Sequence, residues 1–268
     1  MSPIKANQQE LEAMLQAACH FGHKVSKWNP KMRPYLYTQR EGIHIFDLAK
    51  TYECLTRALE FLKESAAAGK TILLVCTKLH ATKLVTEAAK QSGCPFVTRK
   101  WMPGLLTNYE TIRKRIKYFR DLKTARDAGD WEKYTKKERL ELSRTLEKLE
   151  DAFSGVEHMN HLPDVLVIFD AIRDELVLRE AKRLRIPTVG ICDSNADPDL
   201  VTYPIPGNDD AVKSLKYFIE KIGSALEEGK KLHASRVPAP QKPDQARAQA
   251  VTEKVAEKAT SLPEIPVV

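Results

Sequence analysis

Several aspartates stand where an α/β enzyme would keep catalytic or metal-binding carboxylates. Asp170 ends the apolar run VLVIFD, Asp193 ends VGICD, and Asp209 and Asp210 follow further along the chain. Carboxylates at the ends of strands hold Mg²⁺ in many phosphate-handling enzymes. The simpler interpretation is that these side chains cap the following helices and close loops. We find no nucleophile with a partnered base beside them in the sequence, which favours the structural interpretation over catalysis.

A histidine pair, His20 and His23 in the stretch HFGH, is a second candidate for metal binding. Together with Asp193 and Asp210, the pair offers nitrogen and oxygen ligands for a structural zinc or magnesium ion. Zinc sites normally add further Cys or His ligands at short spacing, and none follows this pair. The alternative, which we favour, is that both histidines make hydrogen bonds beside a tight turn at Gly22.

The sequence lacks the glycine-rich loops that bind nucleotide phosphates, since neither G-x-G-x-x-G nor G-x-x-x-x-G-K-[ST] is present. Gly69-Lys70-Thr71 resembles part of the second motif, but it precedes the strand-like run TILLVCT. A Walker loop follows a strand and opens a helix, so these residues are read as a turn. We therefore expect no nucleotide cofactor and no small-molecule substrate.

The segment 19–40 carries five basic side chains and no acidic one. Pro30 and Pro34 stiffen it, so the basic side chains are presented at low entropic cost. The mixture suits RNA, because cations neutralise phosphates while aromatic rings stack on unpaired bases or pack beneath the basic layer. The alternative is a solvated surface loop whose aromatic residues belong to the core. The residues predicted to contact RNA are Lys24, Lys27, Trp28, Lys31, Arg33, Tyr35 and Arg40.

A second basic segment, residues 99–126, contains nine basic side chains and two acidic ones. A Pro103-Gly104 turn leads into Thr107-Asn108, which we expect to open a helix with a capping box. The exposed amides and the dipole of a helix N-terminus favour phosphate. Charged helix faces are often merely solvated, but this one extends the basic segment. The residues predicted to contact RNA here are Arg99, Lys100, Trp101, Asn108, Arg113, Lys114 and Lys117.

The distribution of charge also points to a polyanionic partner. Forty-three Lys and Arg against 36 Asp and Glu give a net charge of +7 and an isoelectric point near 9.0. The segments 19–40 and 99–126 carry +5 and +7, which leaves −5 for the rest of the chain. Positive charge concentrated in this way is the footprint of phosphate binding.

The cysteines and the apolar runs indicate a cytoplasmic protein. The five cysteines are an odd number without a C-x-x-C pair, which argues against a disulfide framework or a zinc ribbon. The stretch MSPIKANQQELEAML has neither the apolar core of a signal peptide nor an Arg-rich transit pattern. No apolar run approaches the roughly 20 residues that a membrane-spanning helix needs.

The elements that position these residues alternate between strands and helices. The runs that we expect to form strands are 42–48, 71–77, 96–97, 163–170 and 186–193. The predicted helices are 51–68, 81–91, 173–183 and 211–228. Near-continuous Val, Ile and Leu in strands that alternate with helices indicate a parallel sheet covered on both faces. The predicted fold class is α/β, a flavodoxin-like, doubly wound sheet in a three-layer α/β/α arrangement.

Residues 108–158 interrupt this alternation, and we predict an antiparallel coiled-coil helical hairpin there. Ile112, Ile116, Phe119 and Leu122 form one apolar stripe. After a polar turn and a capping box at 135–138, Leu142, Leu146, Leu149, Phe153 and Val156 follow at heptad spacing. From residue 234 the composition is that of a disordered tail. The expected domains are therefore a body of residues 1–107 and 159–233, a hairpin of residues 108–158, and a tail of residues 234–268.

Taken together and in order, six segments closely resemble the bacterial small-subunit ribosomal protein S-two family. They are HFGH (20–23), WNPKMRPYLYTQREGIHIFDL (28–48), KWMPGLLTN (100–108), the hairpin residues 135–144, MNHLPDVLVIFD (159–170) and the long stretch 186–214. The resemblance spans residues 8–230. Two departures are Lys100, where the family usually has Arg, and Pro103, where it usually has Gly. Lysine keeps the charge but loses the two-pronged geometry of arginine, so phosphate contact is kept and a base contact is put in doubt.

The resemblance implies a structural role without catalytic activity. It implies binding to small-subunit ribosomal RNA, contact with neighbouring ribosomal proteins, and a part in seating ribosomal protein S-one late in assembly. The protein would then be located in the cytoplasm, in the ribosome. The alternative function is an α/β metal- or nucleotide-dependent enzyme that uses Asp170, Asp193, Asp209 and Asp210. A second alternative is a protein-docking module whose hairpin pairs with another helix.

Overall fold

The structure is a computed structural model, and it describes residues 8–236. The chain divides into a compact unit that ends at His233 and a second unit, residues 234–268. Of the second unit only residues 234–236 are described, where they complete the last helix. The predicted disordered tail therefore lies almost entirely outside the described residues.

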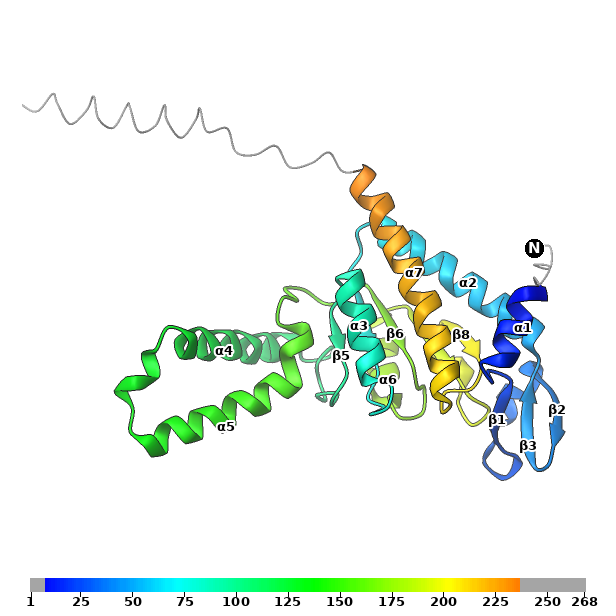
Figure 1. Cartoon of the computed structure of the whole chain (residues 1–268), viewed down its shortest axis with the longest axis horizontal. Coiled ribbons are helices and arrows are strands. Elements are labelled where there is room, and N and C mark those ends of the chain that lie inside the picture. The colour runs from blue at the N-terminus through cyan, green and yellow to red at the C-terminus, as the bar shows by residue number, and fades with distance from the viewer. Residues whose placement is uncertain (1–7, 237–268) are drawn as a thin grey trace, which may run out of the picture. The chain divides into compact units, whose positions relative to one another are not determined.

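The compact unit is built on a five-stranded parallel sheet (Figure 1). Its strands are β4 (Ile72–Val75), β5 (Phe96–Val97), β6 (Val165–Ile168), β7 (Thr188–Cys192) and β8 (Tyr203–Pro206). They lie in the order β5-β4-β6-β7-β8, and every neighbouring pair is parallel. Counted along the chain this is the order 2-1-3-4-5, one of the two common doubly wound orders. The predicted α/β class is confirmed, and β8 is a strand that the sequence analysis missed.

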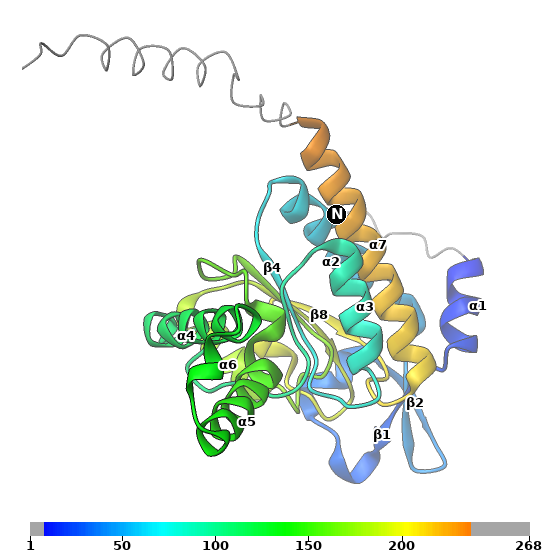
Figure 2. The same ribbon diagram turned by 60° about the vertical axis from the view of Figure 1, so that its left-hand side comes forward.

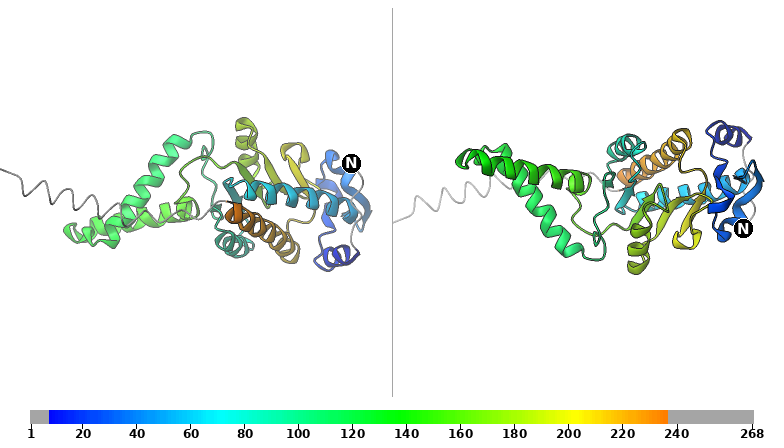
Figure 3. Two further views of the ribbon diagram at one scale, coloured as in Figure 1. Left: turned by 90° about the horizontal axis from the view of Figure 1, so that it is seen from above. Right: turned by 90° about the horizontal axis from the view of Figure 1, so that it is seen from below.

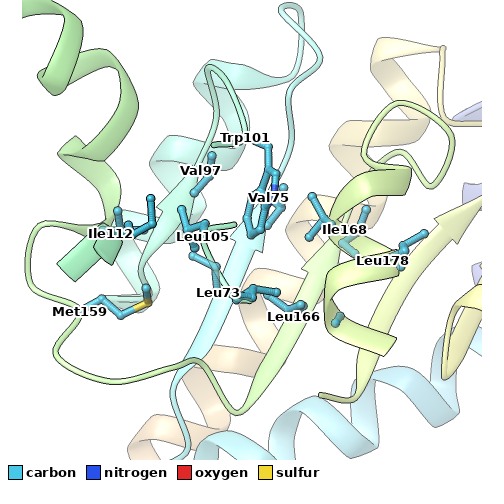
Figure 4. Packing of buried hydrophobic residues seen from close by; sticks show 14 of the residues in the cluster. Leu73, Val75, Val97, Trp101, Leu105, Ile112, Met159, Leu166, Ile168 and Leu178 are labelled. Atoms are coloured by element: carbon cyan, nitrogen blue, oxygen red, sulfur yellow. The ribbon is translucent and has the colours of Figure 1, made fainter. Parts of the chain in front are cut away.

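Helices cover both faces of the parallel sheet, because successive strand residues point to opposite sides. Ile72 and Leu74 pack with α2 (Leu48–Ala67), α3 (Thr82–Ser92) and α7 (Val212–Arg236). Figure 2 shows these three helices on one side of the strands, with α6 (Glu175–Leu184) on the other. Leu73 and Val75 pack toward α6 in the second cluster, which Figure 4 shows at close range. The helix predicted for 211–228 is present and continues to Arg236.

A second sheet of three antiparallel strands corrects one prediction. Its strands are β1 (Phe21–Lys24), β2 (Leu36–Arg40) and β3 (Ile43–Phe46), in the order β1-β3-β2, and α1 (Gln8–Gln16) precedes them. The run 42–48 was expected to belong to the parallel sheet, and that expectation is wrong. Its side chains are alternately half-buried and buried, as in a strand with one face on the core.

Two long helices, α4 (Tyr109–Asp127) and α5 (Lys136–Phe153), form the region that interrupts the alternation of strands and helices. They pack against each other and extend away from the sheet (Figures 1 and 3). The predicted stripe of α4 is buried at Ile112, Ile116, Phe119 and Leu122. Trp131, in the short helical turn between α4 and α5, is buried as well.

The two predicted capping boxes had different outcomes. The box at 135–138 is present, with Thr135 and Glu138 bonded to each other's backbone amides. The box at 107–110 does not form, because Asn108 is the N-cap of α4 and makes no side-chain cap bond. Across residues 8–236, no helix is long and apolar enough to span a membrane.

Candidate functional site: a buried charge cluster and a cationic surface

The predicted aspartates meet at the carboxyl end of the parallel sheet, around a lysine that the sequence analysis missed. Lys78 follows β4, and its Nζ lies 3.0 Å from Asp170, 2.8 Å from Asp209 and 2.8 Å from Asp210. It also donates to the backbone carbonyl of Asp209 at 2.6 Å. Lys78, Asp170 and Asp209 are each less than 10% exposed. The crevice where doubly wound sheets bind ligands therefore contains the chain's own ammonium group.

The protonation of this cluster follows from one ammonium facing several carboxylates. Burial alone would lower the pKa of Lys78, but the carboxylates of Asp209, Asp210 and Asp170 together outweigh burial and raise the pKa above the ordinary value. Burial raises the pKa of Asp209 to about 7, and the charges of Asp193 and Asp170 add to that rise. Lys78 is therefore charged at neutral pH, while Asp209 takes up a proton as the pH falls through about 7.

His23 ties the small sheet to this cluster. Its Nδ1 lies 3.1 Å from Asp193 and its Nε2 lies 3.4 Å from Asp210. The hydrogen bond to Asp193 raises the pKa of His23, although burial opposes the rise. The predicted glycine turn at HFGH is a strand, β1, and a Cβ on Gly22 would approach Ser194 Oγ to 2.9 Å. Gly22 is thus needed for the close approach of β1 to the loop after β7.

Of the predicted metal-binding set, only His23 and Asp193 come together, with Asp209 as the third member in place of Asp210. Ligand atoms of His23, Asp193 and Asp209 lie within 4.8 Å of one another. His20 is not a member of this group, and its Nδ1 is buried without a hydrogen-bond partner in the described part of the chain. Asp209 is already bonded to the Lys78 ammonium, so an added ion would share that carboxylate with a cation. The residues suit a structural hydrogen-bonded cluster better than a zinc site, and metal binding stays a prediction.

The basic loop 24–40 presents most of its cations to solvent. Lys24, Lys27, Arg33 and Arg40 are exposed. Lys31 is exposed as well, but unlike them it forms ion pairs, with its Nζ 2.8 Å from both Asp197 and Asp199.

Two aromatic residues of this loop, Trp28 and Tyr35, are half-buried, whereas Tyr37 is 77% exposed. The ring of Trp28 lies on that of His44, with 5.1 Å between the centroids, and Tyr35 packs against the core. For Trp28 and Tyr35, the structure favours packing beneath the basic layer over stacking on unpaired bases.

The loop that leads into α4 packs around a buried carboxylate, that of Glu180. Glu180, only 6% exposed, accepts hydrogen bonds from the backbone N–H groups of Gly104, Leu106 and Thr107 at 2.9–3.2 Å. It also accepts from Trp101 Nε1 at 3.1 Å. These amides belong to the turn before α4, which begins at Tyr109, so phosphate binding at the first turn of the helix itself stays a prediction.

Trp101 is itself only 7% exposed, so its indole is not available to stack on a base. Burial would raise the pKa of Glu180, yet the donated bonds hold it below its ordinary value.

The remaining predicted RNA contacts of this region are exposed. They are Arg99, Lys100, Asn108, Arg113, Lys114 and Lys117. Arg99 makes a long contact of 3.7 Å with Asp151, where both side chains are mostly solvated, and such pairs contribute little. Arg113, Lys114 and Lys117 line a hollow along α4. The surface cations and the buried cluster are thus separate features. The surface cations are available to a polyanion, whereas the buried carboxylates already pair with Lys78.

The chain is similar to known proteins over most of its length. A family model described as Ribosomal protein S2 matches residues 14–229. A protein of Coprothermobacter proteolyticus is 46% identical over 220 residues, which are 82% of each chain, and one of Dictyoglomus thermophilum is 46% identical over 83% of this chain and 90% of its own. Both are named small ribosomal subunit protein uS2. A protein of Cyanophora paradoxa named small ribosomal subunit protein uS2c is 42% identical over 82% of this chain and 94% of its own.

Proposed function

The chain belongs to the ribosomal protein S2 family, and we propose that it is a structural constituent of the small ribosomal subunit that binds ribosomal RNA. The observation that carries this proposal is the extent of the match. Relatives named as small-subunit proteins align over four-fifths or more of both chains. In this role the protein works in the cytoplasm, on the ribosome, beside neighbouring small-subunit proteins.

Exposed cations are the groups that would contact the RNA. Lys24, Lys27, Arg33 and Arg40 supply them on the first basic segment. On the second they are Arg99, Lys100, Arg113, Lys114 and Lys117, with Asn108 beside them. Trp28 and Tyr35 support the first group from beneath. We assign Lys31 and Trp101 structural roles, because carboxylates of the same chain already accept hydrogen bonds from their side chains.

The finer architecture belongs to the same proposal. The strand order 2-1-3-4-5 supports a flavodoxin-like body of residues 1–107 and 159–233. The heptad spacing of Leu142, Leu149 and Val156, with Leu146 and Phe153 between them, supports a coiled-coil hairpin over residues 108–158. From the family resemblance we also propose that the protein helps to seat ribosomal protein S-one.

The competing hypothesis, a metal- or nucleotide-dependent enzyme, has lost its main support. It required the carboxylates at the carboxyl end of the sheet to face a ligand. Lys78 donates to three of them instead, and the family is one of ribosomal proteins.

The test is the binding of the purified full chain to small-subunit ribosomal RNA across a range of salt concentrations. We expect the logarithm of the binding constant to fall linearly with the logarithm of the salt concentration. Replacing Lys24, Lys27 and Arg33 together with alanine should make the slope shallower by about 0.7 to 0.9 for each lost phosphate contact. Lys216→Ala, a change of an exposed lysine on α7, is the control. An unchanged slope in the triple variant would remove this loop from the interface, and no binding by the wild type would contradict the proposed function.

A further inference from the structure

A hollow of about 590 Å³ lies along one face of α4, apart from the buried charge cluster. We call it the α4 hollow. Its lining consists of Glu110, Arg113, Lys114, Lys117, Arg120, Asp121 and Asn160. The helical residues recur at intervals of three and four, so they share a face, and Asn160 comes from the segment between α5 and β6.

The cations of the α4 hollow are not neutralised by the chain. Within residues 8–236, Arg113, Lys114, Lys117 and Arg120 form no ion pair, although Glu110 and Asp121 lie at helical spacing from them. Lys123, one turn beyond, does pair with Glu157 at 2.9 Å. The four cations stand between the two acids, which are three turns apart, about 16 Å along the axis. The hollow therefore has a positive centre with a net charge of +2 from its lining.

Arg120 adds a donor without an acceptor. The residue is half-buried, and its Nε is buried with no hydrogen-bond partner among residues 8–236. A buried donor left unpaired is unfavourable, and an arginine presents its donors in a planar fork that matches phosphate. An anion in the hollow would supply the missing acceptor.

Tyr109 holds the walls of the hollow together. Its hydroxyl donates to the carbonyl of Met159 at 2.9 Å, which fixes Asn160 beside the first turn of α4. Burial raises the pKa of Tyr109, while the positive charges of Arg113 and Arg120 oppose that rise. The two arginines and Asn160 thus line the same hollow, whose two sides are joined by the bond from Tyr109.

We propose that the α4 hollow binds a phosphate group of the RNA backbone, with Arg113 and Arg120 as the fork. Lys114 and Lys117 contribute flanking charge, and Asn160 supplies a neutral donor. The proposal rests on the proposed function, because it names a site through which this chain would bind ribosomal RNA. It extends that function to Arg120 and Asn160, which the sequence analysis did not single out.

The first experiment compares Arg113→Gln/Arg120→Gln with a matched control, Arg115→Gln/Arg126→Gln, in the full chain. The control arginines lie on the same helix outside the hollow, and both doubles change the net charge equally. We expect the hollow double to bind small-subunit RNA about tenfold more weakly and to lose about 0.7 to 0.9 of the salt slope, the value for one phosphate. The control should keep the wild-type slope.

Because Arg120 is half-buried, Lys114→Gln/Lys117→Gln is a second variant at exposed positions, and it should also make the slope shallower. Equal changes of the salt slope in the hollow and control variants would overturn the proposed site, because the positive charge of α4 would then act on the RNA from a distance. No shift in any hollow variant, with normal wild-type binding, would also overturn it and leave the proposed function standing. Only a wild type that fails to bind RNA would contradict the function itself.

The second experiment titrates the free, ¹⁵N-labelled chain with inorganic phosphate and follows the arginine Nε–H signals by NMR. We expect the Arg120 signal to shift while that of Arg115 stays in place. If Arg120 responds to phosphate but no hollow variant changes RNA binding, the hollow takes free phosphate and the RNA assignment is wrong. If a polyglutamate peptide shifts the signal and RNA does not, the occupant is an acidic protein segment instead.

Discussion

Replacing Lys78 with methionine tests whether the carboxyl end of the sheet is held closed by a structural ion cluster. Methionine keeps most of the side chain's length and apolar stem but removes the ammonium that donates to Asp170, Asp209 and Asp210. Asp170 and Asp209 are 4% and 2% exposed, so they would be left as buried, unpaired charges. Asp210 is largely solvated and would contribute much less.

Removing one partner of a buried ion pair typically costs about 3 to 5 kcal/mol. We expect a loss of that size in the free energy of unfolding for Lys78→Met above neutral pH. The folded-state pKa of Asp209 is about 7, raised from 3.8, so this residue favours folding at low pH and loses that contribution as the pH rises through about 7. Without the ammonium the pKa of Asp209 rises further. The gap between variant and wild type should therefore be widest above pH 8 and narrow below about pH 7.

The assay is urea unfolding of the full chain between pH 5 and 9, followed by the fluorescence of the buried Trp101 and Trp131. Lys216→Met is the matched control, because Lys216 is exposed and makes only a 3.7 Å pair with Glu220. The control should stay within about 0.5 kcal/mol of wild type. A Lys78→Met variant no less stable than the control, or a deficit independent of pH, would refute the reasoning.

Three further changes test other parts of the structure by the same unfolding assay. Glu180→Gln should cost about 2 to 3 kcal/mol, because an amide cannot accept all the bonds that the carboxylate takes from Trp101 and the backbone. The pKa of Glu180 is held below its ordinary value of 4.5, so this loss should shrink as the pH falls below 4.5 and the carboxylate takes a proton. Thr135→Ala should cost about 1 kcal/mol and speed amide exchange in the first turn of α5, where it breaks the box with Glu138. The pKa of His23 is raised above 6.5, so this side chain stabilises the fold most strongly below pH 6.5. His23→Gln should therefore be less stable than wild type at low pH, and the difference should shrink as the pH rises above 6.5.

Much of the fold could be predicted because its strongest signals are local. Within the predicted strands, residues 72–76 and 165–169 are continuously apolar, and both runs form strands buried on two faces. The run 42–48 looked similar but belongs to an antiparallel sheet with one face on the core. A short apolar run does not reveal which strand it pairs with or whether the pair is parallel, because pairing depends on contacts with residues remote in the sequence. Strand β8, with two prolines, gives no strand signal and forms at the edge of the sheet.

The carboxylates of the buried cluster were predicted from the sequence, but the lysine that they surround was not. Aspartates at strand ends are recognisable, whereas Lys78 reads as an ordinary surface lysine until the aspartates are brought around it. Glu180 was missed for a related reason, since it sits in the charged helix ELVLREAKRL and its burial depends on the 98–108 loop folding over it. The available signal was that Trp101 needs a partner for its N–H once buried.

The central claim is that this chain is an RNA-binding structural protein of the small ribosomal subunit. The most direct measurement is the sedimentation of the full chain with small subunits from the same cells, in low and in high salt. We predict one copy per small subunit at low salt, and release into the light fractions as salt displaces its cations from phosphate. A protein that stays in the light fractions at low salt, apart from the small subunits, would contradict the claim.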